Sequence, residues 1–570
     1  MIIMVVIFVS TIVALIKLPS RAPVIFGAAM LATFILNLVD EQEILQSATN
    51  VGLLSLVLLL LASVAVEKTS LIRWLSAKID SQHFSIAWLK LYFFTAFSSA
   101  FLNNTAIVST LISPIRNNKN LSSSKLLIVL SYAAILGGTL TLVGTSTNLL
   151  VNSMLLETGH QGLGFFELTK IGLLATLVCA VVIYFVSSHI PEFETSDESV
   201  DDYLLNAKVT NQSNLIGKSV KDANLRHLDS LFLVEIIRDN KAIRPVTPDH
   251  IIKNGDRLVF SGDVKQVAQL NQFSGLQIAT DAHLFDSQQM TEVVVKQNSI
   301  LVNKTLKTAN FRSKFNAAVI AIKRDGQMLG GKLGQVRLQA GDFLVLATGN
   351  DFKKRENIKK NFIFLSGVEP NHKLTGYKQA IPVIGFLAVI ASAALGILSL
   401  FKGLIVLLAI NLLTKTLQLQ DIRQRFPFEI WLIISSALVL AHGIENTGLV
   451  NYLVTTADFT LSVENSFLFM VCLFITSLIL TELVTNNAAA ALAFPFAYGL
   501  PSLFGLDPMP FVLAVIFGAN ASFISPFSYQ TNLMVFNAGQ YRFSQFVKAG
   551  LPVSMTYSVV VLTSLNWVYF

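Results

Sequence analysis

The sequence predicts an α-helical polytopic membrane protein: an inverted-topology repeat with two re-entrant hairpins, and two small α/β domains inserted between its halves. Three observations predict this class, namely the composition, the recurring apolar runs and the internal repeats. Of 570 residues, 53% are hydrophobic and 14% are charged, and the mean hydropathy is +0.61. Soluble proteins carry about 25% charged residues. The composition therefore excludes an ordinary soluble enzyme of this size.

Apolar runs long enough to cross a bilayer recur along the chain, and each span needs about 20 mostly apolar residues. The candidate spans lie near 1–17, 22–39, 51–67, 126–155, 168–188, 379–400, 403–414, 429–448, 511–536 and 550–569. The first run lacks a basic start and a small-residue cleavage site, so we expect a retained helix and not a signal peptide. We expect a multi-pass protein of the plasma membrane, which is the inner membrane in bacteria.

A polar, charged segment interrupts the apolar pattern between about residues 191 and 378. Its apolar runs, such as 231–237 and 343–347, are short and bounded by turn residues, as in strands. We therefore expect a soluble insert between two membrane parts. The expected boundaries are 1–190 for the N-terminal membrane half, 200–285 and 286–370 for two inserted domains, and 378–570 for the C-terminal membrane half.

The insert contains an internal repeat. Residues 215–226 match residues 301–312 at an offset of 86, and the same offset carries Gly255-Asp256 onto Gly341-Asp342. Self-similarity at a fixed spacing is the signature of a duplicated structural unit. The insert is therefore expected to be two copies of one small α/β module.

Charged residues in the loops predict the orientation. Basic and acidic loops alternate, with Lys17, Arg21, Lys68, Arg73 and Lys78 in the basic ones and Asp40, Glu41 and Glu43 between them. Basic loops face the cytoplasm, so the N-terminus is expected outside and the insert inside. Stretch 87–115 connects two basic loops, and stretch 466–500 connects two loops that are expected outside. Each stretch therefore returns to its own side of the membrane, which predicts two re-entrant hairpins.

The two membrane halves resemble each other. Residues 144–151 match 528–535 at an offset of 384, and residues 67–71 match 445–449 at an offset of 378. Two halves with the same order of elements and opposite orientations form an inverted-topology repeat, a common construction for secondary transporters.

Four polar clusters lie where apolar residues are expected, at 103–105, 145–148, 485–487 and 525–532. A polar group in lipid costs several kcal/mol unless it is paired. Ordinary helix–helix hydrogen bonds remain the alternative for any single residue. They explain poorly why the clusters form two pairs related by the repeat, so we expect a substrate site near the midplane.

The chemistry of the clusters favours an anion held together with cations. Broken helices expose N-termini that attract anions, and neutral oxygens suit sodium. The expected break points are Gly137, Gly138, Gly144, Gly518 and Pro526. No Asp, Glu, Lys or Arg lies in the four clusters, which argues against a proton relay built on a carboxylate.

The modules of the insert resemble the C-terminal domain of the TrkA/RCK potassium-transport regulators (TrkA-C). Both copies have an opening that ends in Leu225-Arg226 or Phe311-Arg312 and a close built on Gly-Asp. The resemblance implies dimerisation and a possible small-molecule ligand of the two cytoplasmic domains. A structural spacer is the alternative. Neither copy carries a Rossmann glycine motif, so we expect no nucleotide site of that kind.

The membrane halves resemble the divalent anion:sodium symporter family, which includes sodium/sulfate and sodium/dicarboxylate symporters. The segments FLNNTA, GTSTNLLV, VTNNAAAALAFP and SPFSYQTNLMV carry the resemblance. Paired TrkA-C modules are similar to the sulfate-permease-like branch. The family has two Ser-Asn-Thr motifs at its hairpin tips, where this chain has Asn103-Asn104-Thr105 and Thr485-Asn486-Asn487.

The resemblance implies a transporter and not an enzyme, with sodium as coupling ion, no organic cofactor, and a homodimer that works by an elevator-like movement. The implied sodium ligands are Asn103, Asn104, Gly144, Thr147 and Asn148 for one site, and Thr485, Asn486, Ala521 and Asn532 for the other. The implied anion ligands are Asn104, Thr105, Asn486 and Asn487.

The expected function is sodium-coupled symport of a divalent oxyanion such as sulfate, and a dicarboxylate is the close alternative. A potassium-linked channel or transporter is a weaker alternative, because the chain has no TVGYG-like filter. A membrane enzyme is weaker still, because no span carries metal-ligand spacing. His442 is interpreted as a satisfied helix-end residue. The basic residues are explained by membrane orientation and by the insert, so nucleic acid is not an expected partner.

Overall fold

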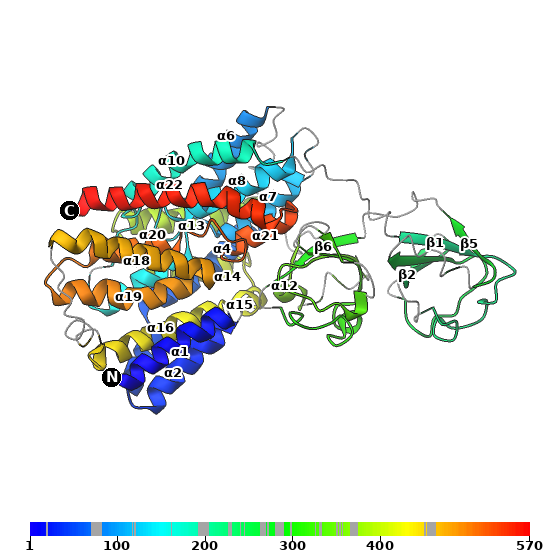
Figure 1. Cartoon of the computed structure of the whole chain (residues 1–570), viewed down its shortest axis with the longest axis horizontal. Helices are drawn as coiled ribbons and strands as arrows, with labels where there is room; N and C mark the ends of the chain where they lie inside the picture. Colours follow the sequence, from blue (N-terminus) through cyan, green and yellow to red (C-terminus); the bar gives the residue numbers. More distant parts are fainter. Residues whose placement is uncertain are drawn as a thin grey trace. The chain divides into compact units, whose positions relative to one another are not determined.

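The computed structural model (Figure 1) forms two compact units. One unit comprises Met1–Pro191, His372–Phe536 and Phe543–Phe570, and the other comprises Glu192–Asn371 and Asn537–Arg542. The residues that the structure describes are 1–18, 21–69, 83–116, 118, 121–160, 162–191, 204–225, 231–239, 241–243, 246–262, 270, 273–279, 290–296, 299–324, 327–329, 333–348, 352, 355, 357–364, 374, 376–449, 452 and 463–570. The basic residues Arg73 and Lys78 of the first predicted inner loops lie outside the described residues.

The first part of the larger unit is a series of helices. They are α1 (Ile2–Lys17), α2 (Ala22–Ile35), α3 (Glu41–Ala48), α4 (Val51–Glu67), α6 (Phe84–Ser99), α7 (Asn104–Arg116), α8 (Ser123–Gly138), α9 (Ser146–Glu157) and α10 (Thr169–Ser188). Local chemistry defines their starts. Asp40 and Glu43 form a reciprocal capping box on α3, and Asn50 caps α4 by accepting from two backbone amides.

The second part continues after η8 (Gly376–Gln379). Its helices are α13 (Ala380–Ala394), α14 (Leu400–Leu413), α15 (Leu419–Arg425), α16 (Phe428–Asn446), α18 (Val463–Leu483), α19 (Asn486–Leu503), α20 (Met509–Ala519), α21 (Gln530–Ala538) and α22 (Phe543–Tyr569). Adding 378 to the bounds of α2 gives those of α14. Offsets of 378 to 384 pair the remaining helices in the same order.

The packing repeats as well. Helix α6 packs on α8 as α18 packs on α20, and α1 packs on α2 as α13 packs on α14. Helix α2 packs on α16 of the other half, and correspondingly α14 packs on α4. The two sets of helices are therefore interlocked, because each half supplies a partner for the other.

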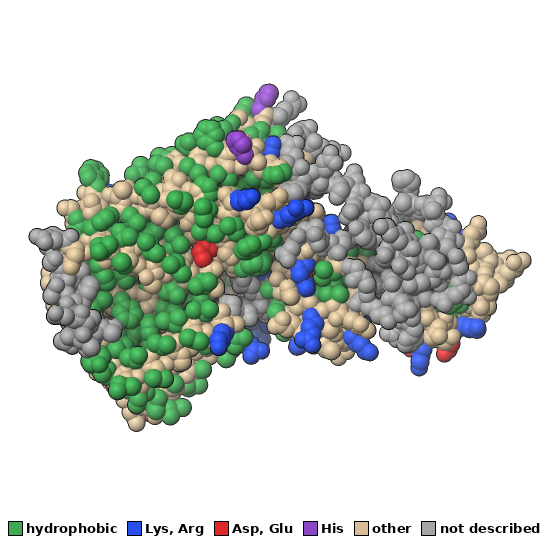
Figure 2. Space-filling view, in the orientation of Figure 1, with side chains coloured by type: hydrophobic (Ala, Val, Ile, Leu, Met, Phe, Trp, Pro, Cys, Tyr) green, Lys and Arg blue, Asp and Glu red, His purple; other side chains and the backbone are tan. Residues whose placement is uncertain are grey.

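Six of the described helical stretches are long and apolar enough to cross a membrane. They are Glu41–Glu67, Thr169–Ser188, Gly376–Ala394, Phe428–Asn446, Asn465–Leu483 and Phe543–Tyr569. Their exposed faces are apolar, with Leu173 and Val181 exposed on α10 and Met555 and Val559 exposed on α22. Figure 2 shows hydrophobic side chains over most of the visible face of this unit. These features are those of a polytopic membrane protein.

Two of the candidate spans are each two helices, and the break points expected from the sequence lie in or beside the divisions. The run 126–155 is divided into α8 and α9 by the segment 139–145, and the run 511–536 is divided into α20 and α21 by the segment 520–529. Buried Asn148 and Asn532, in the helices that follow the two segments, donate to carbonyls that the breaks leave without helical partners. The stretches 87–115 and 466–500 are the helical hairpins α6–α7 and α18–α19.

Glycines allow the closest helix contacts of this unit. A Cβ on Gly137 would overlap the carbonyl oxygen of Ala96, and one on Gly518 would lie 2.6 Å from that of Phe474. A second repeat-related pair, Gly172 and Gly550, meets the backbones of the broken-helix segments in the same way. These four positions exclude any side chain unless the backbones separate.

The smaller unit contains two five-stranded antiparallel sheets. The first has β1 (Leu204–Val209), β2 (Leu231–Arg238), β3 (Lys241–Ile243), β4 (Arg257–Gly262) and β5 (Leu276–Ala279), in the order β3-β2-β4-β1-β5. The second has β6 (Met290–Val295), β7 (Ala317–Arg324), β8 (Gln327–Met328), β9 (Phe343–Thr348) and β10 (Phe362–Phe364), in the order β10-β6-β9-β7-β8. The second sheet also has α11 (Phe311–Phe315), η6 (Leu333–Gln335) and α12 (Ile358–Asn361) beside it.

The two sheets are alike in detail. Strands β1, β2 and β4 coincide with β6, β7 and β9 at an offset of 86, and an irregularity in pairing occurs at equivalent places in β2 and β7. Arg238 Nε lies 2.8 Å from Asp256 Oδ1, and Arg324 Nε lies 2.7 Å from Asp342 Oδ1. The hydrogen bonds that Arg238 donates to the Asp256 carboxylate raise the pKa of Arg238. The two copies found in the sequence thus have equivalent strands, an equivalent pairing irregularity and an equivalent Arg–Asp pair.

We predict that Gly550→Ala lowers stability by about 2 kcal/mol or more, because the new methyl group overlaps the backbone of Phe523. Thermal unfolding of the detergent-solubilised protein measures the effect. Gly27→Ala is the matched control, since its nearest neighbour is a Leu432 methyl at 3.6 Å. Equal melting temperatures for the two variants would show that the close approach is not required.

We also predict that Asp256→Asn destabilises the first sheet by about 1–3 kcal/mol, because the fully buried carboxylate holds two nitrogens of Arg238. Limited proteolysis of the full chain should then cut faster within 204–279 than in the wild type. Asp342→Asn is the matched control and should instead sensitise 290–364. Faster cutting of both sheets by either variant contradicts the assignment of one pair to each sheet.

Candidate functional site

The first polar cluster forms the tip of the α6–α7 hairpin. Asn103 Oδ1 accepts from the backbone amides of Thr105 (2.9 Å) and Ala106 (3.3 Å), so Asn103 caps the N-terminus of α7. Asn104 is buried, and its Oδ1 lies 2.5 Å from Ser99 Oγ. The tip therefore presents a capped helix N-terminus and an oriented amide.

The third cluster forms the corresponding tip of the α18–α19 hairpin. Thr485 Oγ1 accepts from the backbone amide of Ala488 (3.3 Å) and caps α19 as Asn103 caps α7. Asn486 is buried, and its Oδ1 accepts from the backbone amide of Asn487 (3.0 Å). The two tips thus use different residues for one purpose, which is to start a helix inside the unit.

The second and fourth clusters each contain an asparagine that clamps its own broken-helix segment. Asn148 Nδ2 donates to the carbonyls of Gly138 (3.1 Å) and Thr141 (2.9 Å). Asn532 Nδ2 donates to the carbonyls of Ser522 (2.7 Å) and Ser525 (3.3 Å), the equivalent positions at an offset of 384. Both asparagines are fully buried. The same bond pattern in both halves replaces helical bonds that the break removes.

The first hairpin tip contacts the second broken helix. Asn104 Nδ2 donates to Tyr529 Oη at 3.0 Å, and Thr105 Oγ1 donates to Gln530 Oε1 at 3.3 Å. Gln530 is exposed and Thr105 is half-buried, so this contact borders an accessible region. The expected anion ligands of the first half therefore meet residues from the opposite half.

The second hairpin tip contacts the first broken helix. Asn487 Oδ1 accepts from Ser146 Oγ and from Thr147 Oγ1, both at 3.1 Å. Asn148 Oδ1 accepts from Asn520 Nδ2 at 2.8 Å. Each tip thus bonds to the broken helix of the other half, and the four clusters form one region.

The structure places the residues named from the sequence as follows. Asn104, Thr105, Thr147, Asn148 and Asn487 make contacts across the halves, and Asn532 does so through Ser131 Oγ at 2.6 Å. Asn103, Thr485 and Asn486 make the tip contacts described above. Gly144 and Ala521 lie in the broken-helix segments, where Gly144 packs against the Gly138 backbone and Ala521 is fully buried.

Sequence reasoning missed Glu482, which lies near the C-terminus of α18. Its two carboxylate oxygens accept from the backbone amides of Ile524 (2.9 Å) and Ser525 (2.7 Å) in the second broken-helix segment. The side chains in the contacts described above are otherwise neutral. An acidic residue inside an apolar run, three positions before Thr485, is the signal that identifies it.

Sequence reasoning also left Tyr529 and Gln530 without a role, although both lie in the fourth cluster. The repeat places them opposite Thr145 and Ser146, so this half has larger side chains at two equivalent positions. That difference in size could have identified the two residues from the sequence, because the next two positions, Thr-Asn, are identical in both halves. The two residues contact the first hairpin tip and thereby fix its amide and hydroxyl.

Comparison with known proteins identifies the family that the chain matches. Residues 5–515 match the family model CitMHS, described as Citrate transporter. An uncharacterized transporter of Synechocystis sp. is 28% identical, with 94% of this chain and 92% of the relative covered. A putative sulfur deprivation response regulator of Chlamydomonas reinhardtii is 27% identical, with 95% of this chain and 97% of the relative covered.

Sodium/sulfate cotransporter 2 of the same alga is 26% identical over 64% of this chain and 43% of the relative. The family model covers most of the chain, and the relatives named here include transporters. Together with the apolar helices, this similarity indicates a multi-pass membrane transporter and not an enzyme. The chain belongs to the citrate transporter family.

Proposed function

We propose that the protein is a sodium-coupled symporter that carries a divalent oxyanion such as sulfate across the plasma membrane, the inner membrane in bacteria. The observation that carries the proposal is the meeting of two hairpin tips and two broken helices at one polar region, whose side chains are neutral apart from Glu482. Relatives named as sodium/sulfate cotransporters support the coupling ion and the anion.

The anion is proposed to lie between the N-termini of α7 and α19. Each helix start has a partial positive charge and backbone amides that favour negative charge. Asn104, Thr105, Asn486 and Asn487 are the proposed anion ligands, because they begin these helices. Asn104 Nδ2 and Asn487 already bond to residues of the opposite half. An anion bound by both tips would therefore link the same two halves.

Sodium ions are proposed to balance the charge of the anion. One site would use Asn103, Asn104, Gly144, Thr147 and Asn148, and the other would use Thr485, Asn486, Ala521 and Asn532. The donor set fits a hard cation, because it offers neutral amide, hydroxyl and carbonyl oxygens. Glu482 holds the amides of the second segment, and in this proposal it keeps the backbone beside Ala521 in place.

The matched helix order and matched clamps support an inverted-topology repeat with two re-entrant hairpins. We further propose a homodimer with an elevator-like movement. The matching sheets support two cytoplasmic TrkA-C-like (RCK) domains with boundaries 200–285 and 286–370, between membrane halves 1–190 and 378–570. These domains are proposed to bind a small regulatory ligand.

A carboxylate is the second candidate substrate, and the description of the family as citrate transporters favours it. A di- or tricarboxylate is longer than sulfate and needs more room between the tips. Tyr529 and Gln530 occupy the space beside Asn104 and Thr105. Their size therefore favours a compact oxyanion in this chain.

We predict that proteoliposomes take up radiolabelled sulfate several-fold faster with an inward sodium gradient than with an equal potassium gradient. Unlabelled thiosulfate should compete, whereas succinate and citrate should not. The stored gradient is the only energy source, so sodium dependence measures coupling directly. Sodium-driven uptake of succinate or citrate, without sulfate uptake, would favour the carboxylate candidate.

We predict that Asn148→Ala and Asn532→Ala each raise the sodium concentration for half-maximal uptake by about tenfold or more. Each change removes a proposed sodium ligand and leaves two carbonyls of the adjoining broken-helix segment without their donor. Asn446→Ala is the control, because its partner Glu43 lies away from the site. Unchanged sodium dependence in both clamp variants, at normal protein levels, would contradict the proposed cation sites.

A further inference from the structure

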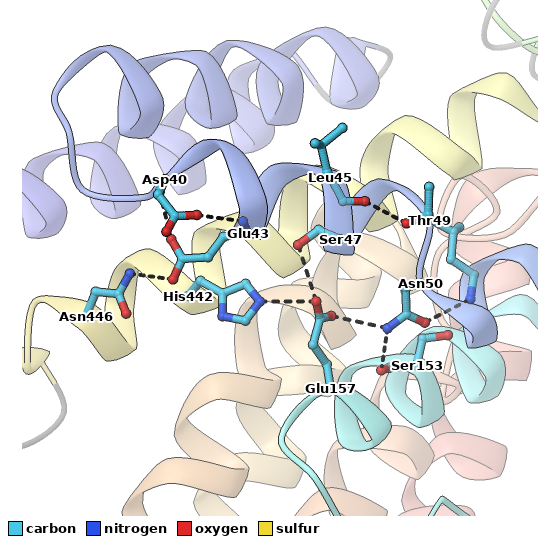
Figure 3. Close-up of polar contacts among 11 residues, drawn as sticks. Asp40, Glu43, Leu45, Ser47, Thr49, Asn50, Ser153, Glu157, His442 and Asn446 are labelled. Atoms are coloured by element: carbon cyan, nitrogen blue, oxygen red, sulfur yellow. Dashed lines mark hydrogen bonds and ion pairs between the residues drawn. The ribbon is translucent and has the colours of Figure 1, made fainter.

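The C-terminal end of α9 is tied to three other helices by one carboxylate (Figure 3). Glu157 Oε1 lies 3.1 Å from His442 Nε2 on α16 and 3.4 Å from Ser47 Oγ on α3. Glu157 Oε2 accepts from Asn50 Nδ2, at the start of α4, at 3.3 Å. Asn50 also donates to the Ser153 carbonyl of α9 at 3.4 Å. We call Glu157, His442, Ser47 and Asn50 the α9 junction.

The α9 junction is largely removed from water. The side chain of Glu157 is 12% exposed and that of His442 is 21% exposed, and Ser47 is fully buried. A carboxylate in such a place is unfavourable without partners. The three partners of Glu157 therefore hold α9 in this position, because leaving it would strand the carboxylate.

The α9 junction is absent from the equivalent place in the repeat. The neighbouring contact between Glu43 and Asn446 does have a counterpart, the ion pair of Asp421 with Lys68, at an offset of 378. At the same offset, His442 corresponds to Val64, which lies in an apolar cluster. The counterpart of His442 thus packs among apolar side chains, so a polar contact at this position is not required for the packing of these helices.

Helix α9 connects the α9 junction to the proposed substrate site. Its first turn carries Ser146 and Thr147, which bond to Asn487, and its last residue is Glu157. Twelve helical residues extend about 18 Å and behave as a rigid rod. A shift of the site relative to α3, α4 and α16 must therefore break the contacts of Glu157.

We propose that the α9 junction is a latch that stabilises one of the two orientations of the transport cycle. This inference rests on the proposed function, because only a transporter that alternates its site needs such a latch. Closed, the latch holds α9 against α3, α4 and α16 as in this structure. Open, it frees the α9 end, and Glu157 and His442 contact water in place of each other.

If the latch exists, breaking it should change the accessibility of the substrate site as well as the rate of transport. Gln530 is exposed in the structure, in which the latch is closed. A cysteine at position 530, in a Cys472→Ser background, reports how often the chain adopts this orientation. Breaking the latch should slow its labelling by a membrane-impermeant maleimide about threefold or more, because the closed orientation becomes less populated.

The variants are His442→Val, which installs the residue of the repeat counterpart, Glu157→Gln, and the two combined. We expect each single change to slow labelling and to raise the maximal rate of sodium-driven sulfate uptake about threefold. The KM for sulfate should change less than twofold, because no anion ligand is altered. The double variant should match the single ones, since both remove one contact.

Glu43→Gln is the matched control, because it alters a carboxylate in the same area that joins α3 to α16 without touching α9. It should leave labelling and uptake unchanged. Ser47→Ala, which removes only the 3.4 Å hydrogen bond, serves as a mild variant if His442→Val fails to fold.

Unchanged labelling in His442→Val and Glu157→Gln, or additive effects in the double variant, would overturn the latch. A changed KM with an unchanged maximal rate would overturn it too, and would assign the pair to substrate binding. If the wild type takes up no anion, the proposed function fails, and the labelling rates still decide whether the latch exists.

Discussion

The need to pair polar groups inside an apolar unit controls the rest of the structure. Where lipid replaces water, each buried amide or hydroxyl must find its partner within the protein. Asn148 and Asn532 meet this need by bonding to the carbonyls that their broken helices release. The glycines at 137, 172, 518 and 550 then let neighbouring backbones approach these segments. Each half thus contains the same combination of a broken helix, an asparagine that bonds to its carbonyls, and glycines that allow close packing.

The same constraint joins the two halves. A hairpin tip cannot satisfy its amide alone, so Asn104 uses Tyr529 and Asn487 uses Ser146 and Thr147. These bonds cross between halves, as do the packings of α2 on α16 and of α14 on α4. The resulting region is neutral apart from Glu482, whose charge is taken up by backbone amides.

The inserted sheets follow a different rule, because water is available to their surfaces. Each relies on an apolar core and on one buried aspartate that fixes an arginine, Asp256 with Arg238 and Asp342 with Arg324. The membrane unit places its exception at the end of α9. There Glu157 contacts His442, whose repeat counterpart, Val64, lies in an apolar cluster. The two halves therefore differ at the end of α9, and they differ again at Tyr529, which corresponds to Thr145 of the first half.

The sequence by itself determined the membrane class, the polar insert with its duplicated module, and the four polar clusters. These features follow from local composition, from spacing and from self-similarity, which need no knowledge of distant contacts. It did not determine that Asn104 meets Tyr529, that Glu482 reaches the segment after α20, or that Glu157 meets His442. Such partners lie about 40 to more than 400 positions apart along the chain. Only the tertiary structure decides them, because the packing of interlocked helices chooses which buried polar groups can reach one another.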